Sequence, residues 1–209
     1  MFPSATEIHL PMILLAAFVA SASPGPATLM IAGTAMNRGS RSALAVASGV
    51  TCGSLCWSIA AALGLGAVML ANARAFEVLR VAGGVYLAFL ALKSARSAFS
   101  RQEAAVIGFV ATTKGAAFRK GLTLHLTNPK AILFFGALYS MGVPANASMA
   151  SLALLIVAIG TQSFVIFHGY ALLFSLPAVM NFYRRARRAF EAVFALAFGA
   201  AAWKILSLR

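Results

Sequence analysis

The sequence contains no aspartate and only 4 acidic residues among 209, against 17 lysines and arginines. Charged residues make up 10% of the chain and hydrophobic residues 61%, whereas a soluble domain carries roughly 25% charged residues. No Asp, Glu, Lys or Arg occurs between Ala131 and Tyr183, and a membrane span needs about 20 apolar residues. The shortage of charge therefore argues against a soluble domain and predicts an all-α integral membrane protein.

The sequence also lacks the motifs of intramembrane enzymes and metal sites. Neither His-Glu-x-x-His nor Gly-x-Ser-x-Gly occurs, so no nucleophile with its base and no metal cluster is expected. The 2 cysteines, Cys52 and Cys56, are too few for a metal framework, and we expect them to be small core residues. The sequence thus predicts no enzyme activity, no metal and no cofactor.

The net charge of +13 does not indicate nucleic-acid binding. The basic residues form short clusters between apolar segments and do not alternate with aromatic residues along one surface. Twelve of them lie in the first, third and fifth links: Arg38, Arg41, Lys93, Arg96, Arg101, Lys114, Arg119, Lys120, Arg184, Arg185, Arg187 and Arg188. Four lie on the other side: Arg74, Arg80, Lys204 and Arg209. Because cytoplasmic loops are rich in Lys and Arg, both termini are predicted outside.

The apolar residues form about six transmembrane segments. They are Ile8–Asn37, Ser42–Ala73, Phe76–Leu92, Leu122–Met141, Met149–Val179 and Phe190–Leu206. We expect one transporter domain over residues 1–209, with halves at about 1–97 and 115–209 joined by a polar cytoplasmic loop at 98–114.

The first and fourth segments share a pattern that indicates an internal repeat. In each, a proline is followed by glycines seven and thirteen residues later, starting from Pro26 and from Pro129. Two halves of three spans each must have opposite orientations in the membrane. The pattern therefore predicts two inverted repeats, an arrangement common in secondary transporters.

Proline motifs interrupt these two segments near the middle of the membrane. One is Ser23-Pro24-Gly25-Pro26 and the other is Asn128-Pro129-Lys130. Because proline removes a backbone donor and clashes with the preceding turn, both motifs are predicted to break the helix. Each break starts a half-helix whose free N–H groups and positive dipole end favour an anion. Two such ends at the midplane predict a site for a substrate carboxylate; structural kinks are the alternative.

Polar side chains beside the breaks are candidates for substrate binding. Lys130 is charged and lies within a span, so we expect it to complement the carboxylate; otherwise its side chain would reach the interface. Thr127, Asn128 and Gln162 are predicted to meet the substrate ammonium. No carboxylate is expected inside the membrane, so the site should suit a neutral zwitterion better than a dication.

The predicted proton or polar path involves His125, Ser163, His168 and Tyr170. Histidine titrates near neutral pH, and the other two side chains are polar neighbours in the fifth segment. Hydrogen bonding between helices is the alternative role for both histidines.

Several stretches together resemble the LysE/RhtB family of amino-acid exporters. They are Ser23–Pro26, Asn37–Gly39, Gly49–Gly53, Gly83–Leu87 and Gly121–Ala131. The resemblance implies export of amino acids or close derivatives from the bacterial cytoplasm across the inner membrane, driven by an ion gradient, and it implies that both proline motifs belong to the pathway. Many relatives place Asp or Asn where this chain has Ala27, and Asp where it has Ser163.

The predicted function is therefore secondary export of a small, neutral amino acid or derivative, with the proton as the favoured coupling ion and membrane lipid as the surroundings. The alternatives are a membrane scaffold or assembly subunit without transport, and an exporter of another small solute. The sequence leaves open which solute moves, which ion drives it and whether the chain is a homodimer.

Overall fold

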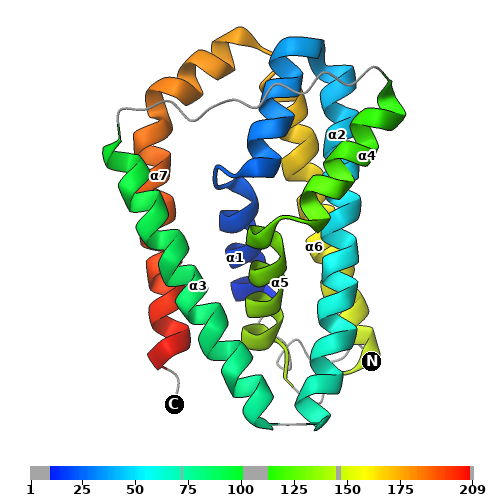
Figure 1. The fold of residues 1–209 in the computed structure, drawn as a ribbon, viewed down its shortest axis with the longest axis vertical. Coiled ribbons are helices and arrows are strands. Elements are labelled where there is room, and N and C mark those ends of the chain that lie inside the picture. The colour runs from blue at the N-terminus through cyan, green and yellow to red at the C-terminus, as the bar shows by residue number, and fades with distance from the viewer. Residues whose placement is uncertain (1–9, 72, 101–112, 145–146, 208–209) are drawn as a thin grey trace.

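The computed structural model describes residues 10–71, 73–100, 113–144 and 147–207, and in these residues it contains helices and no strand (Figure 1). The helices are α1 (Leu10–Ala22), α2 (Pro26–Ala71), α3 (Ala73–Phe99), α4 (Lys114–Leu126), α5 (Pro129–Gly142), α6 (Met149–Leu173) and α7 (Pro177–Ser207). The all-helical prediction is confirmed.

The long helix α2 is two helices joined at Gly39. This residue has φ 75° and ψ 175°, which is not helical. A positive φ is accessible to glycine at little cost because it has no Cβ. The chain reverses direction at this point, so α2 runs up to one end of the molecule and then back along its length (Figure 1).

Both proline motifs end one helix and begin another. α1 ends at Ala22 and α2 begins at Pro26, while α4 ends at Leu126 and α5 begins at Pro129. Proline fits the first position of a helix, where its missing N–H would have no partner within the helix. Each half of the chain therefore has a broken helix followed by two long helices, once α2 is divided at Gly39.

Three helices extend further than predicted: α3 continues to Phe99, α4 begins at Lys114 and α7 begins at Pro177. The apolar pattern stops where polar residues begin, but Lys, Arg and Ala are good helix formers and the helices continue. Ala117 in the added turn of α4 is fully buried, so packing also supports the extension. The predicted loop at 98–114 is shorter as a result, and its residues 101–112 lie outside the described residues.

α2 and α4 pack so closely that only glycine fits at their contact. A Cβ added to Gly49 would lie 2.1 Å from the Phe118 carbonyl oxygen, and one added to Gly121 would lie 2.3 Å from the Val46 carbonyl oxygen. α3 instead packs along α7, and this pair flanks the other helices (Figure 1). The two helix breaks lie between the α2–α4 pair and the α3–α7 pair (Figure 1).

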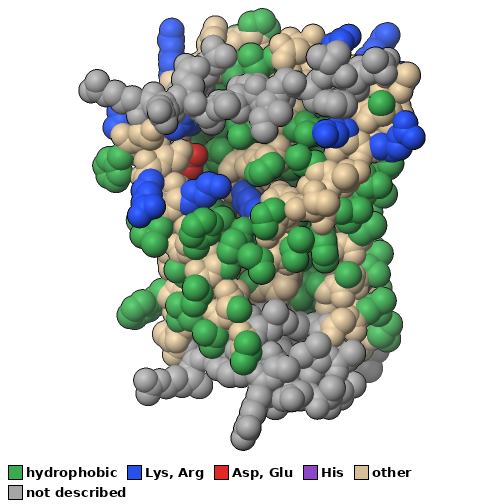
Figure 2. Space-filling model, in the orientation of Figure 1, with side chains coloured by type: hydrophobic (Ala, Val, Ile, Leu, Met, Phe, Trp, Pro, Cys, Tyr) green, Lys and Arg blue, Asp and Glu red, His purple; other side chains and the backbone are tan. Residues whose placement is uncertain are grey.

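The outer surface is apolar over most of its length. Leu15, Leu63, Val165 and other large hydrophobic side chains are exposed, as they must be where lipid replaces water. The described Lys and Arg side chains gather toward one end (Figure 2). Two helical stretches, Pro26–Gly64 and Met149–Leu173, are long and apolar enough to cross a membrane, and the first of them contains the Gly39 turn.

The cysteines are not in the core. Cys52 and Cys56 are both exposed on α2, so the prediction that they pack inside is wrong. In a membrane protein an apolar side chain on the outer surface is as stable as one in the core, because lipid is as apolar as the protein interior.

Candidate substrate site between the helix breaks

Lys130 joins the two helix breaks. From the first turn of α5, its ammonium donates hydrogen bonds to the carbonyl oxygens of Ala20 at 3.1 Å and Ser23 at 3.3 Å, and to the Ser23 hydroxyl. These acceptors lie at the C-terminal end of α1, where carbonyls lack partners within the helix and the dipole is negative. The Lys130 side chain therefore points toward the end of α1.

The N-terminal end of α5 is capped by the residue before it. The Asn128 side-chain oxygen accepts from Lys130 N at 3.0 Å, and its backbone oxygen accepts from Ala131 N at 2.9 Å and Ile132 N at 3.1 Å. Pro129 has no N–H to offer. The expectation of unpaired N–H groups is thus wrong for α5, because asparagine is a good N-cap. The positive charge at this break comes from the Lys130 ammonium, with the helix dipole adding to it.

Two cavities meet at Lys130. The wide cavity, of about 350 Å³, is lined by Ser23, Pro24, Gly25, Pro26, Tyr86, Phe89, Leu90, Lys93, Ser94, Ser97, Asn128, Pro129, Lys130, Glu191 and Phe198. The narrow cavity, of about 40 Å³, is lined by Ala17, Ala20, Ser21, Gly25, Ala27, Thr28, Ser54, His125, Asn128, Lys130, Ala131, Phe134, Phe135, Ile159, Ser163 and Phe167. Gly25, Asn128 and Lys130 line both, so the two cavities adjoin at these residues.

The size of the wide cavity suits a small solute. Small-molecule sites have volumes of roughly 300–1,000 Å³, and the wide cavity falls at the lower end of this range. A Cβ added to Gly25 would lie 3.3 Å from the Lys130 Nζ. Glycine at this position therefore gives the ammonium room beside the break.

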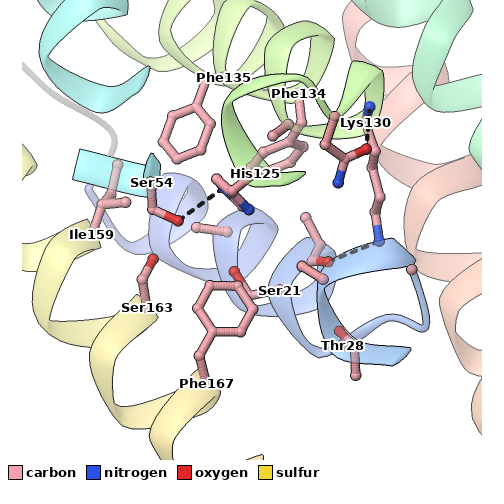
Figure 3. Close-up of a pocket in the computed structure, with 16 residues that line it drawn as sticks. Ser21, Thr28, Ser54, His125, Lys130, Phe134, Phe135, Ile159, Ser163 and Phe167 are labelled. Carbon is pink, nitrogen blue, oxygen red and sulfur yellow. Dashed lines mark hydrogen bonds between the residues drawn. The ribbon is translucent and has the colours of Figure 1, made fainter. Parts of the chain in front are cut away.

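His125 lies on the narrow cavity and is buried. Its Nε2 is 3.0 Å from the Ser54 hydroxyl (Figure 3), and its ring lies at 70° to that of Phe167 with the centroids 6.0 Å apart. Its Nδ1 is buried without a hydrogen-bond partner in the described part of the chain. Ser163 of α6 also lines this cavity. The structure thus brings together two residues of the predicted polar path.

Two polar residues of α6 hold α1 in place. The Gln162 side-chain nitrogen donates to the Leu14 carbonyl oxygen at 2.9 Å, and the Tyr170 hydroxyl donates to the Ala22 carbonyl oxygen at 2.9 Å. Neither lines the two cavities. Both residues therefore form hydrogen bonds between helices, from α6 to α1.

Two other predicted site residues lie outside both cavities. Thr127 is exposed, and its hydroxyl donates to the Thr123 carbonyl oxygen of its own helix at 2.9 Å. His168 is 3.0 Å from the Ser48 hydroxyl through Nε2 and 3.0 Å from the Phe164 carbonyl oxygen through Nδ1. The contact with Ser48 of α2 agrees with the alternative prediction, in which His168 forms a hydrogen bond between helices.

The structure adds an acidic residue to the site that sequence reasoning missed. Glu191 of α7 is only 6% exposed and lines the wide cavity together with Lys93 and Lys130. Ser97 of α3 donates to its carboxylate at 2.9 Å. In the sequence, Glu191 follows an Arg-rich stretch and is the second residue of the predicted segment Phe190–Leu206. Its place three residues beyond Arg188, at the start of an apolar run, was the available signal.

The fold and the site define a helical membrane protein with broken helices that meet at a partly buried charge. Residues 18–208 match the family model described as LysE type translocator, and the chain belongs to this family. It is 33% identical over 169 residues to a threonine efflux protein of Salmonella typhi, covering 80% of this chain and 82% of the relative. It is 31% identical over 163 residues to a homoserine/homoserine lactone efflux protein of Salmonella typhimurium, covering 77% of each.

A third relative is a leucine efflux protein of Enterobacter, 29% identical over 163 residues, with 75% of this chain and 77% of the relative covered. No solved structure matches the chain. The family and these relatives identify the chain as a membrane protein of the transport class.

Proposed function

We propose that this protein exports a small neutral amino acid, or a close derivative, from the bacterial cytoplasm. The observation that carries the proposal is the Lys130 ammonium, held between the two helix breaks beside a cavity of suitable size. A charged residue inside a membrane protein is costly and is usually retained for function. Relatives named for the efflux of threonine, homoserine and leucine support the amino-acid class.

In this proposal the substrate carboxylate binds Lys130 from the wide cavity. A carboxylate forms a stronger, charge-assisted hydrogen bond with an ammonium than a neutral carbonyl does. The substrate therefore draws Lys130 away from the Ala20 and Ser23 oxygens that it now contacts. Loss of that bridge between α5 and the end of α1 would open the way from the wide cavity to the narrow one.

The charges around the wide cavity favour a neutral amino acid over a dication. Lys93 and Lys130 bring two positive charges to the wall, and Glu191 brings one negative charge. Lysine or arginine as a substrate would add a further positive charge to this surplus. The prediction of a core without acids is wrong, because Glu191 is buried, but the cavity lining still has a surplus of one positive charge.

The export proposal is tested by loading cells with dipeptides and following release of the freed amino acids. Expression should increase the efflux of at least one neutral amino acid, such as threonine, homoserine or leucine. Efflux that stays unchanged across neutral and basic amino acids would count against it. Increased efflux of lysine or arginine alone would instead overturn the charge argument.

The orientation proposed is that of six spans in the inner membrane, built as two inverted three-helix repeats with both termini in the periplasm. In Figure 1 the broken helix α1–α2 runs toward the end where the Gly39 turn lies, and the broken helix α4–α5 runs away from it. The basic end of Figure 2 would face the cytoplasm. Reporters fused after Gly142 and after Arg209 should read periplasmic, and one after Arg101 cytoplasmic. A cytoplasmic reading at Arg209 would contradict this topology.

A proton gradient is the proposed driving force. A histidine side chain in water titrates near neutral pH. His125 is buried and leaves one ring nitrogen on the narrow cavity without a hydrogen-bond partner among the described residues. The Nδ1 atom of His125 is therefore available to a proton or a water molecule in the narrow cavity. His168 has partners on both ring nitrogens and is the weaker candidate.

A further inference from the structure

The wide cavity is lined by one acidic residue, Glu191, as well as by Lys130 at the helix break. Glu191 belongs to α7, and its partner Ser97 belongs to α3. Lys130 belongs to α5 and reaches across to α1. All three residues line the same cavity. The cavity therefore has a carboxylate from α7 and an ammonium at the helix breaks, with Lys93 of α3 as a second cation in its lining.

The Glu191 carboxylate accepts a hydrogen bond from a neutral group. Ser97 Oγ donates to Glu191 Oε1 at 2.9 Å, and Arg187 donates to Ser97 O and Oγ at 3.1 and 3.3 Å. A hydroxyl donor satisfies part of the carboxylate but does not neutralise it. A buried carboxylate is costly unless a cation pairs with it, so a solute cation entering the cavity would find a strong partner here.

We propose that Glu191, supported by Ser97, binds the ammonium group of the substrate while Lys130 binds its carboxylate. This assignment rests on the proposed function. It makes the wide cavity a site for a zwitterion, with a carboxylate supplied by α7 and an ammonium supplied by α5. It also assigns the specificity for an amino group, because a hydroxy acid of the same shape has the carboxylate but offers no cation to Glu191.

The test compares an amino acid with its 2-hydroxy acid analogue as inhibitors of labelled amino-acid uptake into vesicles that hold the purified protein. The wild-type protein should prefer the amino acid by roughly tenfold or more, the difference that one charge-assisted hydrogen bond makes. Glu191→Gln should bring this ratio close to one, because the amide keeps the shape and the Ser97 contact but loses the charge.

Glu191→Asp is the matched control, because it keeps the negative charge and only shortens the side chain. It should keep most of the preference for the amino acid, whereas a merely structural role of Glu191 would affect both variants alike and both inhibitors alike. A Glu191→Gln protein that keeps the wild-type ratio would overturn the assignment.

A second measurement uses the wild-type protein and needs no variant. A carbodiimide that modifies buried carboxylates should label Glu191, as read by mass spectrometry. The amino acid should protect Glu191 from labelling, and the hydroxy acid should not; equal protection by both would overturn the assignment. Failure of the proposed function is a separate result, because the wild-type vesicles would then take up no amino acid at all.

Discussion

Replacing Lys130 with methionine is expected to lower amino-acid export roughly ten- to a hundredfold. The change keeps the length and apolar bulk of the side chain but removes the charge that would bind the carboxylate. A hydrogen bond to a charged group contributes about 1.5–3 kcal/mol, and about 1.4 kcal/mol corresponds to a factor of ten. The measurement is efflux per unit of protein in the membrane, with abundance determined on the same cells.

Lys114→Met is the matched control for this change. Lys114 is exposed at the start of α4 and lines neither cavity, so its replacement should leave efflux near the wild-type level. Lys130→Arg should recover part of the activity, because the guanidinium is charged but larger than the space beside Gly25. Wild-type efflux from the Lys130→Met protein would mean that Lys130 has a structural role and does not bind the substrate.

Alanine at Gly121 is expected to destabilise the protein by about 1–3 kcal/mol, the range for overpacked contacts. The added Cβ would lie 2.3 Å from the Val46 carbonyl oxygen, and a backbone atom cannot move aside as a flexible side chain can. The helices α2 and α4 would have to separate, and the contact at Gly49 would be disturbed with them. Thermal unfolding of the purified protein in detergent measures this effect.

Gly169→Ala is the control for the same chemical change. Gly169 is helical and lies in α6, and a Cβ added there would meet nothing within 4 Å. Its thermal stability should equal or exceed that of the wild type, since alanine favours a helix more than glycine does. Equal stability of the Gly121 and Gly169 variants would contradict the close packing of α2 and α4.

The sequence predicted the features that depend on local chemistry. Pro26 and Pro129 break their helices wherever they are placed in the membrane, because the missing N–H and the ring clash belong to the residue itself. Lys130 stood out because charge inside an apolar segment is costly. The helices, their breaks and the charged residue between them followed from these properties.

Features that depend on which helices pack together could not be predicted in the same way. Glu191 became part of the site because α7 packs along α3 and turns this side chain toward the break. The Asn128 cap removed the free N–H groups expected at α5, because the cap geometry depends on the path of the chain around Pro129. Thr127 follows His125 by only two residues, yet the helix turn places Thr127 on the surface and His125 inside.

The central claim is that this protein by itself moves a neutral amino acid through the site at Lys130. The most direct test is uptake of labelled neutral and basic amino acids into vesicles that hold the purified protein, with and without a pH gradient. We predict uptake of a neutral amino acid well above that of protein-free vesicles, stimulated by the pH gradient and largely lost in Lys130→Met. Uptake no greater than in protein-free vesicles, for every amino acid tested, would contradict the claim and favour a membrane subunit without transport.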